Sequence, residues 1–325
     1  MSINQVSEPI KSNKILFDKV SIIHDIEKKK EYKEGNTIIK RWDGNEENAN
    51  MYCAKIKNED TYFLGILNDL FQRNGYCVNK YSNGDSYFGY YSDDLRDKHG
   101  FYEFKPKIKN KIRNQEFYFG LWNNDQRNNR GINLWISEPA KNIPFSDFES
   151  ANFGAYVGLF ENNNYKKGTF LSKNEDDYFV YHGYFDSDGN RNGDNCLFYS
   201  STKEQCLYGE FVDNQFDNGY ICKYDDNGDV NDLCKFEEDE IINEEDLDEK
   251  LVHDICLKLH VFRNVIMEKD YFGELYNAFG KAYNFKNNEM NDIDILNNDK
   301  YLDIMTAAII YNKISIFNDI EKFVF

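Results

Sequence analysis

The stretch GDSYFGYYSDDLRDKHGFYEF, residues 84–104, crowds aromatic rings around three glycines. Within it, Tyr87, Gly89 and Tyr91 occupy every second position, and Gly100 follows after a polar loop. Side chains at every second position of a strand point to the same face of a sheet. The stretch therefore predicts a β-hairpin in which a glycine between two rings leaves a slot for a ring of a neighbouring strand.

The same pattern recurs along the chain. Each copy has a lead glycine with an aromatic residue, or leucine in the last copy, two positions before it. The lead glycines are Gly65, Gly89, Gly120, Gly158, Gly183 and Gly209. A second glycine follows 10 or 11 residues later, at Gly75, Gly100, Gly131, Gly168, Gly193 and Gly219. Fixed self-similarity of this kind indicates a repeat architecture. We expect hairpins that lie side by side in one antiparallel sheet.

This pattern resembles the MORN repeat, whose core reads Tyr-x-Gly-x-Trp, then a short turn and Gly-x-Gly. The resemblance covers roughly residues 60–230. The copies depart from the family because the final glycine of Gly-x-Gly is replaced in each of them, and because the gaps between lead glycines vary. The resemblance implies a single-layer elongated sheet in a scaffold of a cytoskeletal or membrane-associated assembly. An unrelated all-β meander is the alternative.

Three regions follow from these patterns. Residues 1–58 form an N-terminal segment and possible sheet cap, in which NTIIKRWDG predicts a strand that starts the sheet. Residues 59–236 hold six degenerate hairpin repeats, and 237–325 form an acidic linker and a helical region. An apolar spacing of three and four predicts an amphipathic helix through Leu247, Leu251, Ile255, Leu259, Phe262 and Ile266. A final helix over residues 298–325, capped by Asn298, is also expected. The fold class is mainly β, a single-layer antiparallel sheet capped by helices.

The net charge and the cysteines limit the ligands and the cellular compartment that the sequence supports. The net charge of −18 argues against nucleic acid, because such binding depends on neutralising phosphates. The alternative function is a peripheral membrane tether that recognises anionic lipid. Two basic stretches, EKKKEYK and FKPKIKNKIRN, would supply the contact. Seven cysteines without Cys-x-x-Cys spacing, and no signal peptide, indicate structural thiols in an intracellular protein of the cytoplasm or cytoskeleton.

No motif indicates catalysis or a cofactor. The loops DSDGNRNGD and DDNGDVND imitate a calcium loop but lack its required glycine, so both are interpreted as hairpin loops. His99 precedes a repeat glycine and is interpreted as structural. His253 and His260 lie seven residues apart without further metal ligands. We expect neither an enzyme nor a metal site.

The leading hypothesis is a non-enzymatic scaffold or adaptor whose aromatic face binds a peptide or helix of a partner protein. The rings expected to line this groove are Tyr87, Tyr91, Tyr118, Trp122, Tyr156, Phe160, Tyr181 and Phe185. The structural alternative is that these rings only stack on one another and on the protein's own helices. A further hypothesis places the final helix in the groove. A homodimer through the sheet ends is possible.

Overall fold

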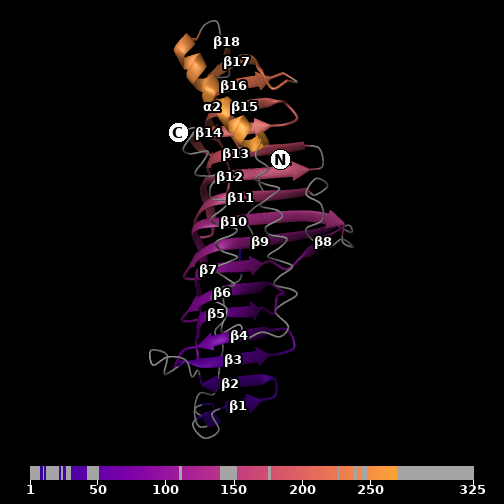
Figure 1. Ribbon diagram of the computed structural model, residues 1–325, viewed down its shortest axis with the longest axis vertical. Coiled ribbons are helices and arrows are strands. Elements are labelled where there is room, and N and C mark those ends of the chain that lie inside the picture. Colours follow the sequence, from indigo (N-terminus) through magenta and orange to yellow (C-terminus); the bar gives the residue numbers. More distant parts are fainter. Residues whose placement is uncertain are drawn as a thin grey trace.

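The computed structural model describes residues 8–9, 11, 22, 25–26, 31–41, 51–109, 112–139, 152–174, 177–225, 227–237, 240–243 and 247–268. They include an antiparallel sheet of 18 strands, followed by the helix α2, Glu249–Glu268 (Figure 1). The strands are β1 Glu31–Glu34, β2 Thr37–Arg41, β3 Tyr52–Lys57, β4 Tyr62–Leu67, β5 Arg73–Lys80, β6 Ser86–Ser92, β7 Leu95–Glu103, β8 Lys107–Lys109, β9 Ile112–Asn123, β10 Gln126–Pro139, β11 Asn152–Glu161, β12 Asn164–Asn174, β13 Asp177–Tyr184, β14 Gly193–Ser200, β15 Gln205–Val212, β16 Gln215–Tyr224, β17 Val230–Glu237 and β18 Glu240–Asn243.

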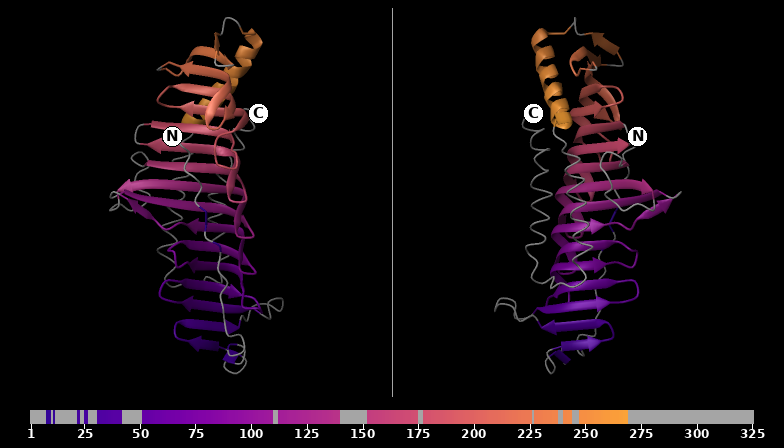
Figure 2. Two further views of the ribbon diagram at one scale, coloured as in Figure 1. Left: turned by 180° about the vertical axis from the view of Figure 1, so that it is seen from behind. Right: turned by 45° about the vertical axis from the view of Figure 1, so that its right-hand side comes forward.

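The sheet grows by one hairpin after another, because strands that follow one another in the chain pair with one another. The strand β8 departs from this order, since β7 and β8 both pair with one edge of β9. Figures 1 and 2 show the result as a long stack of strands with β1 at one end and β18 at the other. This confirms the predicted fold class, a mainly β chain with a long antiparallel sheet and a C-terminal helix.

The sheet extends beyond residues 59–236 at both ends. Strands β1, β2 and β3 lie within residues 1–58. The predicted strand in NTIIKRWDG is β2, but it does not start the sheet as predicted, because β1 precedes it and pairs with it. At the other end, β18 lies within the acidic run and pairs with β17. The acidic run is therefore not only a linker, because part of it forms the last strand.

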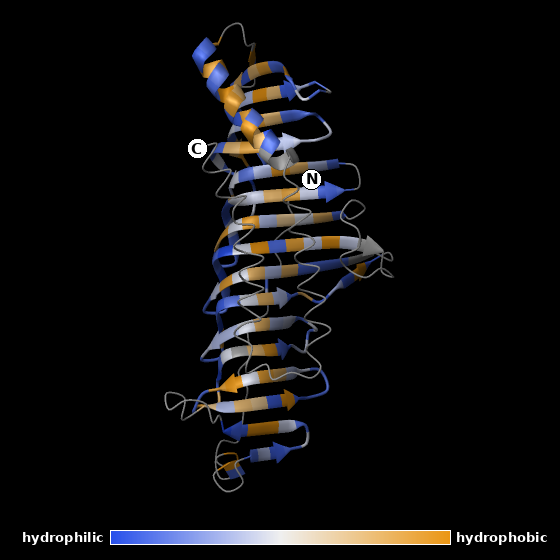
Figure 3. Ribbon diagram, in the orientation of Figure 1, coloured by the Kyte–Doolittle hydropathy of each residue, from blue (hydrophilic) through white to orange (hydrophobic). Residues whose placement is uncertain are grey.

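The predicted amphipathic helix is α2, but two predicted members of its apolar face do not fit, since Leu247 lies before the helix begins and Leu251 is 40% exposed. Asp248 caps it, since its Oδ1 accepts the backbone N–H of Leu251 at 3.0 Å. Ile255, Leu259 and Phe262 are buried against the sheet, and Figure 3 shows hydrophobic and hydrophilic residues alternating along the helix. The predicted final helix, its cap Asn298 and its place in the groove lie outside the described residues.

Both faces of the sheet are apolar. We call the face that carries the lead glycines and their flanking rings the tyrosine face, and the other the opposite face. On the opposite face, α2 packs near β14–β17. Buried residues of that face also include Phe88, Phe101, Phe119, Ile132 and Val157.

Glycines form a continuous row on the tyrosine face. From β6 to β13 each glycine of the row pairs with the glycine of the neighbouring strand, in the order Gly89, Gly100, Gly120, Gly131, Gly158, Gly168 and Gly183. Gly75 and Gly193 do not belong to the row. The prediction that they are equivalent to the other second glycines is therefore wrong. Cys77 and Cys196 take their places, because the loops of these two hairpins, residues 68–72 and 185–192, are longer than the two-residue turns of the other four. Gly75 and Gly193 instead adopt φ of +99° and +120°, where glycine is favoured.

Candidate partner-binding face

The rings expected to line a groove lie together on the tyrosine face, but they are buried. Their exposed fractions run from 0% at Tyr118 to 8% at Phe185. In the four copies with two flanking rings these rings meet edge to face, as Tyr156 and Phe160 do with centroids 5.2 Å apart. From the second copy to the sixth each copy also contacts the next, as Tyr118 and Phe160 do at 5.0 Å. Contact with a partner through these rings stays a prediction, and their visible role is packing.

In four copies the slot beside the lead glycine is filled by a tyrosine ring of the same strand, not by a ring of the neighbouring strand as expected. The Tyr156 hydroxyl donates to the carbonyl oxygens of Leu159 and Lys167, at 2.7 and 2.9 Å. Its ring therefore lies across the paired glycines Gly158 and Gly168. Tyr87, Tyr118 and Tyr181 make the equivalent bond to the carbonyl three residues on. Burial raises the pKa of all four phenols, so they stay protonated donors.

A second contact joins successive copies, and we call it the turn clamp. Four hairpins end in two-residue turns with positive φ at both positions: Asp93–Asp94, Asn124–Asp125, Asn162–Asn163 and Asp213–Asn214. The second turn residue accepts a backbone N–H from an arginine of the preceding copy through its side chain. It returns its own N–H to the carbonyl of that arginine. The clamp pairs are Arg73–Asp94, Arg96–Asp125, Arg127–Asn163 and Arg191–Asn214.

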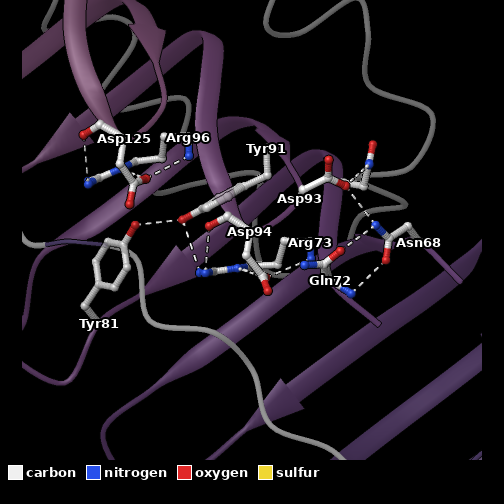
Figure 4. Close-up of polar contacts among 10 residues, drawn as sticks. Asn68, Gln72, Arg73, Tyr81, Tyr91, Asp93, Asp94, Arg96 and Asp125 are labelled. Carbon is white, nitrogen blue, oxygen red and sulfur yellow. Dashed lines mark hydrogen bonds and ion pairs between the residues drawn. The ribbon is translucent and has the colours of Figure 1, made fainter. Parts of the chain in front are cut away.

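In the first two clamps the guanidinium joins the contact. Arg73 Nε lies 2.9 Å from Asp94 Oδ1, and Arg96 Nε lies 3.0 Å from Asp125 Oδ1 (Figure 4). Both arginines are buried, and Arg96 lies 4.5 Å from the ring centroid of Trp122. These arginines were not among the predicted site residues, although each follows its lead glycine by seven or eight residues.

A row of less buried rings runs beside the buried ones. Trp135, Phe170, Phe179 and Phe198 come from β10, β12, β13 and β14, and successive centroids lie 5.7–5.9 Å apart. Phe170 is buried, whereas Trp135, Phe179 and Phe198 are half-buried. We call these four residues the aromatic row. It packs against the tyrosine-face core, so its outer edges are the aromatic surface that this part of the face offers to a partner.

The loops that imitate calcium sites use their carboxylates to close hairpins. Asp186 Oδ1 accepts the N–H groups of Asp188 and Asn190. Asp225 makes the same contacts in its own loop, as the hairpin interpretation predicts. In the part of the chain that the structure describes, no group of three or more candidate ligands could hold a metal ion, and no helix is long and apolar enough to cross a bilayer. All seven cysteines are thiols.

The basic stretch FKPKIKNKIRN contributes β8. Lys105, Lys107 and Lys109 are exposed there, and Ile108 is 66% exposed. The stretch EKKKEYK reaches into β1. Lipid binding by either stretch stays a prediction.

His182 is a titratable group that sequence analysis did not single out. It is fully buried in β13, and its Nδ1 lies 2.9 Å from Thr169 Oγ1. Burial, with a smaller contribution from the charge of Lys167, lowers the pKa of His182 to about 3. The imidazole is therefore neutral in the folded protein at neutral pH.

We expect acid to destabilise the fold through His182. The unfolded chain binds a proton at this residue near pH 6.5, whereas folded His182 stays neutral down to about pH 3. Its contribution is therefore fully present above pH 6.5 and is lost as the pH falls. At about pH 5 the loss is about 2 kcal/mol, because one pH unit corresponds to about 1.4 kcal/mol. Urea unfolding should show the wild type losing that much more stability than His182→Gln between about pH 7.5 and about pH 5. Equal losses would mean that folded His182 titrates normally.

A scan of the chain against models of protein families gives no match, and a search of curated proteins gives none either. The described residues define a class, an elongated protein of β-hairpin repeats that pack through a glycine row and turn clamps. The resemblance to MORN repeats stays a prediction.

Proposed function

We propose that the protein is a non-enzymatic scaffold or adaptor that binds a segment of a partner protein along the tyrosine face, within a cytoskeletal or membrane-associated assembly. The observation that carries this proposal is the aromatic row. Rings supply large contact areas at a low cost in side-chain entropy, and such side chains dominate protein interfaces. The location rests on the resemblance to MORN repeats.

The row suits an extended partner better than the eight buried rings do. Its members come from four strands and stack along the long axis of the sheet. A segment lying along that axis would therefore meet several rings in succession. The buried rings hold the sheet together, so a partner could reach them only by breaking the packing that positions the face.

Replacing Phe179 and Phe198 with alanine is expected to weaken partner capture by about thirtyfold to a thousandfold, since anchor rings contribute roughly 1–2 kcal/mol each. The measurement is affinity capture from native extract, with bound proteins quantified by mass spectrometry. Because both rings are half-buried, the variant should remain folded, and circular dichroism checks this.

The matched control removes two rings from the opposite face. Tyr90 and Tyr184 lie there, each beside a lysine, and Tyr184 is 44% exposed. The double variant Tyr90→Ala/Tyr184→Ala should keep the partners. A folded Phe179→Ala/Phe198→Ala variant that also keeps them would exclude the aromatic row as the binding surface.

A further inference from the structure

Arg191 differs from the other clamp arginines in its exposure. Arg73, Arg96 and Arg127 are at most 1% exposed, whereas Arg191 is half-buried. It stands just before β14, at the end of the aromatic row that Phe198 occupies. Its guanidinium carbon lies 5.2 Å from the ring centroids of Phe198 and Phe211. Arg191 is therefore a partly exposed cation beside Phe198, a ring of the aromatic row.

The clamp of Arg191, like that of Arg127, lacks the carboxylate of the first two clamps. The first two clamps supply a carboxylate, from Asp94 and Asp125, but the fourth supplies the amide of Asn214. The Nη2 group of Arg191 donates to the backbone carbonyl of Asn214. Within the described ranges no ion pair includes Arg191, and its buried Nε has no hydrogen-bond partner. Burial lowers the pKa of Arg191, and no carboxylate offsets that effect.

We infer that Arg191 is an anion anchor for the partner segment, which places an aspartate or glutamate carboxylate on its guanidinium and an apolar side chain on Phe198. This inference rests on the proposed function and names the chemistry of the partner. A guanidinium binds carboxylates through two parallel hydrogen bonds, and such charge-assisted bonds are stronger than neutral ones. Salt screens charges beyond about 8 Å, so most of the net charge of −18 does not act at Arg191. The local opposing charge is the carboxylate of Asp186, because Asn190 bonds both Asp186 and Asn214.

The chain itself suggests the sharpest variant. Asn214→Asp would place a carboxylate at the turn position that Asp125 occupies beside Arg96. The variant should fold, since the first two clamps already contain this pair. The new carboxylate would form an ion pair with Arg191 and compete with the partner's carboxylate for the guanidinium. Asn163→Asp makes the same change at Arg127, which is 0% exposed, and serves as the matched control.

The test selects binders to the full chain from a library of random displayed peptides. Peptides selected on the wild type should carry Asp or Glu beside an apolar residue. A selected peptide should bind Asn214→Asp and Arg191→Met at least about tenfold more weakly than the wild type, since losing a hydrogen bond to a charged group weakens binding by about that factor. Fluorescence anisotropy measures the affinity. Asn163→Asp should bind the peptide as tightly as the wild type.

The outcomes separate this inference from the proposed function. Peptides that need Phe179 and Phe198, but bind equally to the wild type, Asn214→Asp and Arg191→Met, would overturn the anchor and support the adaptor. Peptides that ignore the aromatic row, or a library that yields no binders, would count against both.

Discussion

Replacing Gly158 with alanine is expected to destabilise the sheet by about 3 kcal/mol, the upper end of the usual cost of overpacking. A Cβ at this position would lie 2.5 Å from the carbonyl oxygen of Lys167, 2.6 Å from Gly168 Cα and 2.6 Å from the Tyr156 hydroxyl. Two of these atoms belong to the backbone of β12, so side-chain movement cannot relieve the clash. Urea unfolding, followed by circular dichroism, measures the loss.

The control for this prediction is Gly154→Ala on the same strand. A Cβ there would lie 3.2 Å from the Trp135 ring and 3.4 Å from the carbonyl oxygen of Leu171. These contacts are tight but need only small shifts, and alanine restricts the unfolded chain more than glycine does. Gly154→Ala should therefore change stability by less than about 1 kcal/mol. Equal losses of stability at Gly158 and Gly154 would show that close packing of the glycine row is not the cause of the loss in Gly158→Ala.

Spacing along the sequence was enough to predict the hairpins. Lead glycines with a second glycine at 10 or 11 residues identify paired strands, and the period of two places their rings on one face. The same spacing failed at Gly75 and Gly193, because longer loops, residues 68–72 and 185–192, move the paired position on to Cys77 or Cys196. The distance between two glycines does not show how many of the residues between them belong to the loop, so the spacing alone does not reveal this difference.

The candidate site was less accessible from sequence. Spacing identifies the rings that share a face, but not which of them remain exposed after the neighbouring strands have packed. Tyr156 looks as suitable for binding as Phe179, yet the first lies across two glycines and the second at the edge of the packed face. The turn clamps had a usable signal, an arginine seven or eight residues after four of the lead glycines. Their partners come from the next copy and become recognisable only once the hairpins are aligned.

The glycine row and the turn clamps both connect neighbouring copies. Stability in such repeat architectures is approximately a sum of repeat terms and nearest-neighbour interfaces. A destabilising substitution in one copy therefore weakens its interfaces with the copies on either side. A scaffold of this kind needs intact junctions to hold the aromatic row in line, so the clamps support the proposed function without touching a partner.

Removing the Asp94 carboxylate is expected to cost about 3–5 kcal/mol, because it leaves the guanidinium of a buried ion pair uncompensated. Asp94 Oδ1 accepts both the backbone N–H and the Nε–H of Arg73, at 2.9 Å each. Both side chains are nearly inaccessible to solvent, at 3% and 2% exposed. Water therefore cannot replace the lost partner in Asp94→Ala. Urea unfolding at neutral pH measures the change.

Two further variants identify the cause of that loss. Glu161→Ala removes an ion pair with Lys166 of similar length, 2.8 Å, but both side chains are more than half exposed. Because water screens such a pair, the urea midpoint should hardly move. The double variant Arg73→Met/Asp94→Ala removes the guanidinium and keeps alanine at the turn position, whose φ is +70°, so it should recover part of the stability lost in Asp94→Ala. If the double variant is as unstable as Asp94→Ala, the cost arises from the lost side-chain contact with the Arg73 backbone. If the double variant recovers stability, the loss in Asp94→Ala comes from the buried guanidinium that is left without its carboxylate.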